Sequence, residues 1–292
     1  MESTIEQARR EFDTLVREIR PELHRFCARM TGSVIDGEDV VQDTLAKAFY
    51  LLPQTRQISN LRGWLFRIAH NKAIDLTRSH VRRFSEPLED HNGLVAEVDP
   101  ISQTQLARMG LALFMRLTPV QRGAVILKDV LDHSLEEISE ILDATIGSVK
   151  GALHRGRATL HRLAKDSTPQ PTALDPSEAA KLEDYVRHFA ARDFDQLRLL
   201  LAQDVRLDVV GIAQAHGKSQ VGEYFHRYGG TDSWHPHLGW IEGQPAILVY
   251  ATPDKTGDPV YFILIRWNGN QVYEIKDFRY SRYVMNDAEW SS

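Results

Sequence analysis

Residues 134–162 read SLEEISEILDATIGSVKGALHRGRATLHR, and this stretch decides the fold of the middle of the chain. It predicts two short amphipathic helices joined by a tight turn at residues 143–145. Ser134 can cap the first helix and Glu137 can reach back to it, which makes a capping box. The expected apolar stripes are Leu135, Ile138, Ile141 and Leu142 in the first helix and Ile146, Val149, Leu153 and Leu160 in the second.

The second of these helices is basic and contains no acid. This layout is typical of a helix-turn-helix whose second helix enters the major groove of DNA. The alternative is a helical hairpin with a solvated basic face. A hairpin of that kind needs no run of basic residues free of acids, so the sequence favours DNA binding.

Composition limits the class of protein. The chain has 292 residues, enough for two or three domains, and its 42% hydrophobic and 26% charged residues are ordinary for a globular protein. Its formal net charge of −5 means that any nucleic-acid surface must be local. The first residues lack the apolar run of a signal peptide, and no segment approaches the roughly 18 apolar residues of a membrane span. We therefore expect a cytoplasmic protein with no membrane partner.

Cys27 is the only cysteine, which excludes an internal disulfide and a cysteine-based zinc site. It shares a predicted helix face with Leu23, Phe26 and Met30. This placement favours a buried, inert thiol.

Changes in composition divide the chain into three blocks and two linkers. Residues 1–84 and 102–165 are helical in pattern. Residues 85–101 combine Pro, Asn and Gly with several acids, so we expect an acidic, extended linker there. A second linker is expected at residues 166–176, which are rich in Pro, Ser and Thr. The third block is residues 177–292.

Helix boundaries are visible in the two helical blocks. The first block predicts helices over residues 5–30, 36–52 and 61–83. In the second block Thr118 caps a helix, Pro119 takes its first position and Gln121 completes a capping box.

The third block changes character. A helical stretch at residues 177–201 precedes β-branched and aromatic runs at residues 205–211, 246–252, 259–267 and 271–284. The sequence Asn-Gly-Asn at residues 268–270 predicts a hairpin between the last two runs. Helices followed by a mostly antiparallel sheet indicate an α+β domain. Alternation places Tyr261, Ile263, Ile265 and Trp267 on one face, which is core or pocket wall.

Residues 61–83, LRGWLFRIAHNKAIDLTRSHVRR, form a second basic segment, with six Lys or Arg residues against one acid. Basic side chains neutralise phosphates and position a protein on DNA. Asn71 and Asp75 lie four residues apart on one helix face and can hydrogen-bond base edges, while Phe66 and His70 add rings. A base displaced from the stack would need such contacts. The alternative is a packed helix with a solvated basic face.

Between these segments Asp36, Glu38, Asp39 and Asp43 crowd the start of a helix. Acids at the start of a helix are stabilising through the helix dipole, and this effect alone is one explanation for the cluster. The sharper interpretation is a docking face for a basic partner. Val40, Val41, Leu45 and Phe49 would then lie behind that face.

Together the three segments resemble the extracytoplasmic-function class of bacterial sigma factors, the initiation subunits of RNA polymerase. DGEDVVQDTLAKAF (residues 36–49) resembles the segment that binds the polymerase clamp helices. Residues 61–83 resemble the segment that melts and reads the −10 promoter element, in region 2. LTPVQRGAVILKDVLDHSLEEISEILDATIGSVKGALHRGRATLHRL (residues 117–163) resembles region 4, which reads the −35 element.

The resemblance implies roles for individual residues. Those implied to bind polymerase are Asp39, Gln42 and Asp43. Those implied at the −10 element are Asn71 and Asp75, with Arg67, Lys72 and Arg78 near phosphates. Those implied at the −35 element are Lys150 and His154 on bases, with Ser148, Arg155 and Arg157 on the backbone. Two residues depart from the family pattern, because Gly151 replaces a frequent basic residue and Asp143 replaces a frequent turn glycine.

The third block resembles SnoaL-like domains of the nuclear-transport-factor-like group, which have a cone shape and a curved sheet. Some sigma factors of this class carry such a domain, thought to regulate them in cis, although the Asn-Pro-Asp-Lys-Leu signature of one such group is absent here. The candidate ligand-pocket residues are Asp208, His235, His237, Tyr250 and Asp277. We find no convincing arrangement of base, acid and oxyanion donors among them.

The sequence thus predicts a multidomain protein, with region 2 as an all-α bundle, region 4 as an all-α helix-turn-helix and an α+β cone domain. The expected function is that of an alternative sigma factor, not an enzyme, regulated in cis. The expected partners are core RNA polymerase, double-stranded promoter DNA, the melted −10 strand and an unidentified small molecule in the cone domain. No cofactor or metal is expected. The alternatives are a polymerase-independent helix-turn-helix regulator and a bifunctional chain whose last domain is a small-molecule isomerase, cyclase or hydrolase.

Overall fold

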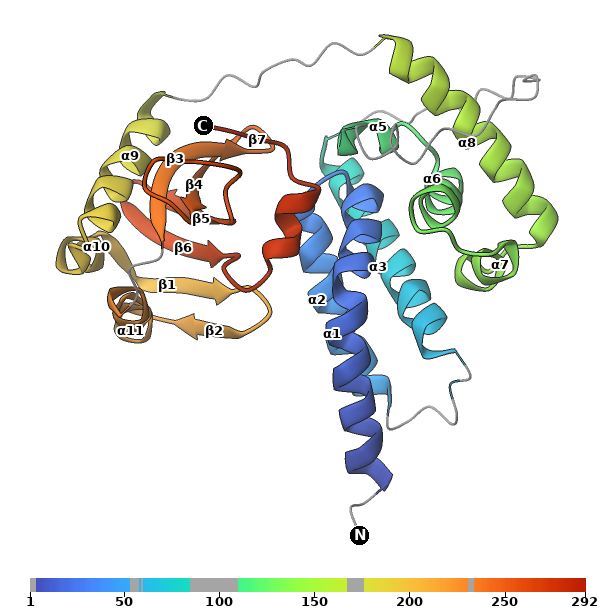
Figure 1. Ribbon diagram of the computed structural model, residues 1–292, viewed down its shortest axis with the longest axis horizontal. Coiled ribbons are helices and arrows are strands. Elements are labelled where there is room, and N and C mark those ends of the chain that lie inside the picture. The colour runs from blue at the N-terminus through green and yellow to red at the C-terminus, as the bar shows by residue number, and fades with distance from the viewer. Residues whose placement is uncertain (1–3, 53–57, 59, 85–109, 167–175, 231–233) are drawn as a thin grey trace. The chain divides into compact units, whose positions relative to one another are not determined.

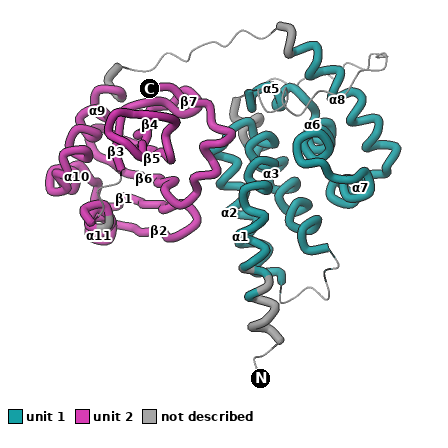
Figure 2. Tube along the Cα trace, in the orientation of Figure 1, with its two compact units in different colours: residues 1–168 teal, residues 169–292 magenta. Residues whose placement is uncertain are grey.

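The computed structural model describes residues 4–52, 58, 60–84, 110–166, 176–230 and 234–292 (Figure 1). The chain forms two compact units, residues 1–168 and 169–292 (Figure 2). The predicted linker at residues 85–101, and the predicted linker at residues 166–176 except for its two ends, lie outside the described residues. The domain boundaries drawn from these linkers therefore stay a prediction.

The described part of the first unit is helical. Its elements are α1 (Thr4–Thr31), α2 (Val34–Leu51), α3 (Leu61–Phe84), α5 (Leu111–Phe114), α6 (Pro119–Val125), a π-helical turn η2 (Ile126–Val130), α7 (Leu135–Leu142) and α8 (Ile146–Asp166). Ser33 caps α2, because its hydroxyl accepts from the amides of Ile35 and Asp36, so this helix begins two residues before the predicted start. The predicted box at α6 is confirmed: Pro119 is at the first position, and the Thr118 amide donates to Gln121 Oε1 at 3.4 Å.

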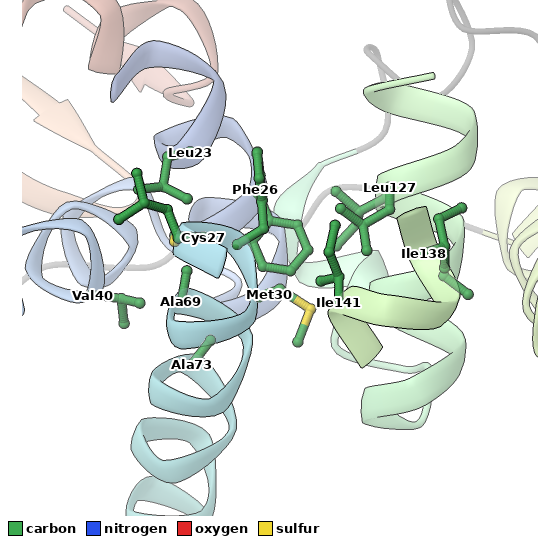
Figure 3. Close-up of a cluster of buried hydrophobic side chains, with 14 of the residues drawn as sticks. Leu23, Phe26, Cys27, Met30, Val40, Ala69, Ala73, Leu127, Ile138 and Ile141 are labelled. Atoms are coloured by element: carbon green, nitrogen blue, oxygen red, sulfur yellow. The ribbon is translucent and has the colours of Figure 1, made fainter. Parts of the chain in front are cut away.

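One hydrophobic core is shared by both helical blocks of this unit. Phe26, Cys27 and Met30 of α1 are within 1% of complete burial, and so are residues of α3, α6 and α7 in the same cluster. Figure 3 shows these α1 side chains beside Ala69 and Ala73 of α3, Leu127 of η2 and Ile138 and Ile141 of α7. The prediction of a buried Cys27 is confirmed. Burial of this apolar surface is the main force that holds the two blocks together.

A buried arginine links the two helical blocks through hydrogen bonds at the carboxyl end of α1. Arg122 of α6 donates to Phe114 O at 2.9 Å, Leu117 O at 3.0 Å, Met115 O at 3.3 Å and Met30 O at 2.5 Å. Its side chain is nearly inaccessible, and burial lowers the pKa of the guanidinium to about 10. The charge is tolerated because four backbone carbonyls compensate for the lost water.

A second polar contact joins the blocks through His133, which precedes α7. Its Nε2 lies 3.5 Å from Glu22 Oε1 of α1, and its Nδ1 lies 3.7 Å from Glu137 Oε2. The ring also meets Phe66 edge to face, with centroids 5.1 Å apart. Burial would raise the pKa of Glu22, but hydrogen bonds from His133 and Arg62 lower it below its ordinary value.

The second unit is an α+β domain, as predicted. Its helices are α9 (Pro176–Ala190), α10 (Phe194–Leu200) and α11 (Lys218–Gly229), with a 3-10 helix η3 (Arg282–Asn286). Its strands are β1 (Leu201–Val209), β2 (Ala213–His216), β3 (His235–Ile241), β4 (Gln244–Tyr250), β5 (Tyr261–Asn268), β6 (Gln271–Asp277) and β7 (Trp290–Ser291). In the described residues the sheet has the order β2-β1-β6-β5-β4-β3-β7, and only the β1–β6 pair is parallel.

One face of this sheet packs on α9, α10 and α11 (Figure 1). The predicted face of Tyr261, Ile263, Ile265 and Trp267 belongs to this core. The predicted hairpin is also confirmed, since Asn268 pairs with Gln271 across a turn in which Gly269 has φ +60°.

Three details of this unit differ from the sequence prediction. The helical stretch is broken at Arg192, which has φ +59°, and Asp193 caps the separate helix α10. The predicted strand at residues 271–284 ends at Asp277 and turns into η3. Helix α11 and strands β2, β3 and β7 were not predicted. Their residues include Gly and several polar side chains, which give a weak periodic signal.

Replacing Arg122 by methionine tests how much its hydrogen bonds at the end of α1 stabilise the protein. The variant keeps an unbranched side chain of similar length but removes the guanidinium that donates to four carbonyls, of which Phe114 O alone is also seen to accept from a backbone amide, that of Leu117. We expect Arg122→Met to lower the free energy of unfolding by about 3 kcal/mol or more. The measurement is urea unfolding followed by far-ultraviolet circular dichroism.

The matched control is Arg116→Met, because Arg116 is exposed in the loop before α6. The free energy of unfolding of that variant should stay within about 0.5 kcal/mol of the parent value. Equal stabilities for the two variants would contradict the role given to Arg122.

Candidate nucleic-acid and polymerase interface

Helix α3 divides its residues between the core and solvent. Arg67, Asn71, Asp75 and Arg78 are exposed, and their spacing of four, four and three places them on one helix face. This face therefore brings together the side chains expected at the −10 strand. Lys72 sits beside it, half-buried, with its Nζ 3.1 Å from Asp43 Oδ2 of α2.

Two rings that the sequence placed among the DNA contacts point into the core instead. Phe66 is completely buried and meets Phe26 edge to face, with centroids 5.4 Å apart. His70, one helical turn later, is 5% exposed. Both share the buried side of α3 with Leu65, Ala69 and Ala73, so periodicity could have assigned them to the core. Burial, and then the nearby charge of Arg122, lowers the pKa of His70 to about 4.

Helix α2 exposes only part of the predicted acidic face. Asp39 and Asp43 are exposed, whereas Gln42 is half-buried with its amide nitrogen lacking a hydrogen-bond partner in the described structure. Glu38 does not belong to this face, because it is completely buried and pairs with Arg20 of α1 at 2.5 Å. Phe49 was expected behind the face with Val40, Val41 and Leu45, but it is 46% exposed. The sign of a charge alone could not reveal that Glu38 has an internal partner.

The helix-turn-helix forms as predicted. The Ser134 hydroxyl accepts from the Glu137 amide at 3.1 Å, and Glu137 Oε2 accepts from the Ser134 amide at 2.8 Å. Asp143 ends α7 in the left-handed conformation, with φ +51°, which explains why glycine is common at this turn and why aspartate is tolerated. Ile146 is the exception to the second apolar stripe. It is 38% exposed because α8 begins there, ahead of the buried residues Val149, Leu153 and Leu160.

The outward face of α8 carries most of the residues expected at the −35 element. Ser148, Lys150 and Arg155 are exposed, and His154 is half-buried. Arg157 differs, because its guanidinium makes two hydrogen bonds to the carboxylate of Asp129, at 2.9 and 2.5 Å. The hydrogen bonds from this pair raise the pKa of Arg157. Its partner Asp129 lies 28 residues earlier in the chain, so no local sequence pattern could predict this ion pair.

A hollow of about 270 Å³ lies beside α8. Its lining includes Lys150, His154 and Arg157 together with Lys128 of η2. Lys128 was not among the predicted site residues. Its Nζ donates to His133 O at 3.0 Å and approaches Asp132, so it is oriented by the loop that precedes α7. The hollow is therefore walled by cations from two segments of the helix-turn-helix.

The structure brings three of the five candidate pocket residues together: His235 pairs with Tyr250 in register, and the His237 ring meets the Tyr250 ring edge to face with centroids 5.5 Å apart. Asp277 pairs in register with Val209, whereas Asp208 pairs with Lys276, so the two aspartates lie on opposite faces of the sheet. His235, His237 and Tyr250 also lie on the face opposite the helices, since their neighbours Ile247 and Val249 belong to the core under α9 and α11. Spacing along the chain could not reveal this, because register decides which face a residue occupies.

Asp277 is instead a buried acceptor at the end of β6. Its Oδ2 accepts from the hydroxyls of Tyr224 at 2.8 Å and Tyr228 at 2.7 Å, and its Oδ1 accepts from the Arg279 amide at 2.8 Å. Burial raises the pKa of this carboxyl. Aromatic side chains fill the space around it, among them Phe189, Trp234 and Tyr261. The carboxyl is therefore committed to holding α11 and the segment after β6.

Two further findings concern the described ranges only. Within them no three His, Cys, Asp or Glu side chains gather in a way that could hold a metal ion. Among the helices of the described residues, none is long and apolar enough to cross a membrane.

Two family models match the first unit, Sigma-70 region 2 over residues 15–83 and Sigma-70 region 4 over residues 111–160. The SigM extracytoplasmic-function sigma factor of Mycobacterium tuberculosis is 30% identical over 152 residues, which cover 52% of this chain and 76% of SigM. The chain belongs to the extracytoplasmic-function sigma factor family. Region 2 of this sigma factor thus contains the exposed faces of α2 and α3, and region 4 contains the helix-turn-helix.

Longer alignments reach into the second unit of the sigma factor. SigG of Mycobacterium tuberculosis is 29% identical over 270 residues, covering 83% of this chain, and the chain spans 66% of the length of SigG. The crystal structure of SigJ from Mycobacterium tuberculosis is 19% identical, with 90% of this chain and 95% of that chain covered and a TM-score of 0.37.

The depressed pKa of His70 predicts a loss of stability in acid. In the unfolded chain the imidazole titrates near 6.5, but in the folded protein it stays neutral down to about 4. Stability that is complete above pH 6.5 is therefore lost as the pH falls toward 4. Between pH 7 and pH 5 this one group should cost about 2 kcal/mol.

The measurement is urea unfolding at several pH values for the parent protein and for His70→Leu, which cannot titrate. The stability of the variant should fall less steeply between pH 7 and pH 5, by about 2 kcal/mol. Parallel curves for the two proteins would show that His70 does not carry this dependence.

We expect removal of the Asp277 carboxylate to lower the stability of the second unit. Asp277→Leu leaves two tyrosine hydroxyls and one amide without their acceptor, which should cost about 2–4 kcal/mol. Tryptophan fluorescence during urea unfolding reports this unit, because four of the five tryptophans lie in it. The control Asp204→Leu changes an exposed aspartate of β1 and should have an effect within about 0.5 kcal/mol.

Proposed function

We propose that this chain is an alternative sigma factor that binds core RNA polymerase and directs transcription from specific promoters. One observation carries the proposal. Three exposed faces of distinct chemistry occur in one family-matched unit: acids on α2, an Asn and an Asp between arginines on α3, and cations on α8, which has no acid before its last residue, Asp166. These chemistries suit a basic protein surface, an unpaired DNA strand and a DNA major groove respectively.

The α2 face supplies the polymerase contact in this proposal. Asp39 and Asp43 lie one helical turn apart and are exposed, so both can meet cations of a partner. Gln42 lies between them but is half-buried, and its amide nitrogen is buried without a hydrogen-bond partner in the described structure, so the two carboxylates carry the contact. Complementary charge of this kind speeds association and sets orientation.

The α3 face supplies the −10 contact. Asn71 and Asp75 present an amide and a carboxylate to base edges, and Arg67 and Arg78 flank them with charges for phosphates. Lys72 joins these phosphate contacts only when it leaves Asp43, its present partner. The exposed ion pair is weak enough for such an exchange.

The α8 face supplies the −35 contact. Lys150 and His154 lie four residues apart, about one helical turn, on the outward face of α8. Both can therefore reach base edges in the major groove. Ser148 and Arg155 lie beside them, where backbone phosphates pass. Arg157 contributes chiefly by fixing α8 to η2 through Asp129, and its guanidinium faces the hollow beside α8.

Promoter geometry requires the two regions to separate. The names of the −10 and −35 elements place them about 25 base pairs apart, or ~85 Å of duplex. A compact unit of 168 residues has a radius of gyration of only ~15 Å. We infer that region 4 leaves region 2 when both elements are bound, so the shared core is a closed form of the sigma factor.

We assign a regulatory role in cis to the second unit. Asp277 lies on the opposite sheet face from the other four candidate pocket residues and is committed to structural hydrogen bonds. These observations favour regulation over catalysis, because a catalytic site needs its groups to converge.

Substituting the α2 acids tests the polymerase contact. In the full chain, Asp39→Asn with Asp43→Asn should weaken binding to core RNA polymerase at least tenfold, because two charges are lost at the interface. The same variant should lose transcription from DNA upstream of the chain's own gene. Binding is measured by fluorescence anisotropy with labelled sigma factor, and transcription by run-off products.

The matched control is Glu136→Gln with Glu140→Gln, which removes two exposed acids at the same spacing on α7. Control and parent should bind the core enzyme alike. If the α2 variant also binds core polymerase normally and retains transcription, Asp39 and Asp43 are not the polymerase contact. If the parent itself does not bind the core enzyme, the polymerase-independent regulator becomes the better description.

A further inference from the structure

Helix α8 contains glycines where alanine would be more favourable. Glycine destabilises a helix interior because it loses more backbone freedom on folding than any other residue. Close packing within the protein or close approach of a ligand can offset this cost. Gly151 and Gly156 of α8 can be compared directly, since they lie in the same helix and neither has a positive φ.

Packing explains Gly156. A Cβ atom there would lie 2.7 Å from Val125 Cγ2 and 3.4 Å from Gln121 O. The 2.7 Å distance is too short for α8 to keep its place against α6, because Val125 is completely buried and cannot turn away. Gly156 is therefore needed for the two helices to approach each other.

Packing does not explain Gly151. The three atoms nearest to a Cβ atom there all belong to the side chain of Arg155, with Nη1 at 3.3 Å, and that side chain is exposed and flexible enough to shift. The residue lies between Lys150 and His154, on the face of α8 that turns away from the core. No backbone atom and no core side chain is among the three nearest atoms that such a methyl group would meet.

We propose that Gly151 is a specificity-determining residue of region 4, which lets α8 sit closer to the base pairs than a helix with a side chain there could. The inference rests on the proposed function. A major groove about 12 Å wide barely admits a helix whose diameter with side chains is 10–12 Å. Hydrogen bonds from Lys150 and His154 to base edges tolerate only a few tenths of an ångström.

The proposal predicts effects of opposite sign on stability and on DNA binding. Gly151→Ala should raise the thermal unfolding midpoint by about 2 °C, because alanine is the better helix former and only Arg155 must move. The same methyl group should hold α8 away from the groove floor. A substitution that merely damaged the fold would lower both quantities.

The experiment uses the full chain and a duplex obtained by selection from a randomised double-stranded library with the parent protein. Fluorescence anisotropy at one fixed salt concentration compares the parent, Gly151→Ala, Gly156→Ala and Lys150→Ala. We expect Gly151→Ala to weaken binding of the selected duplex at least tenfold, with binding of a random-sequence duplex changed less than twofold. Gly156→Ala should lower the thermal midpoint, and Lys150→Ala should weaken binding of the selected duplex.

Selected-duplex binding by Gly151→Ala equal to that of the parent would overturn the inference while leaving the proposed function standing. Equal losses on selected and random duplexes would also overturn it, because they would indicate a general loss of affinity. If the parent protein selects no duplex at all but Lys150→Ala leaves binding of random DNA unchanged, the −35 role itself fails and takes the inference with it.

Discussion

The first unit depends on one constraint: two blocks of helices that lie far apart in sequence must bury a single apolar core. Neither block encloses its apolar face alone, since Phe26 and Met30 of α1 belong to the same cluster as Ile138 and Ile141 of α7. Polar groups at the edge of this core have to be satisfied internally. Arg122 meets that requirement for four carbonyls at once, and His133 places its ring between Glu22 and Glu137.

The functional faces are what this core leaves exposed. On α3 the core takes Phe66, Ala69, His70 and Ala73, and the remaining side carries Asn71 and Asp75. On α8 the core takes Val149 and Leu153, and the remaining side carries Lys150 and Arg155. Stability and recognition thus use different residues of the same helices. A substitution can therefore affect one property without the other.

Local chemistry was predictable from the sequence, and long-range partnership was not. The caps at Ser134 and Thr118 and the hairpin at Gly269 each depend on residues within a few positions, so their patterns were sufficient. Glu38, Arg157 and Asp277 have partners 18, 28 and 53 residues away, and a sequence pattern carries no record of such contacts. The same limitation explains why five polar residues of the second unit suggested one pocket although they occupy two sheet faces.

Cys27 has a practical consequence that follows from its position. It is completely buried in the core that joins the two helical blocks, and burial, with the nearby charge of Glu38, raises the pKa of its thiol. A thiol-modifying reagent can react only when that core opens, because the thiolate is the reactive form and the closed protein suppresses it. The chain holds no other cysteine, so the rate at which a reagent labels Cys27 measures how often this core opens. No probe has to be introduced for that measurement.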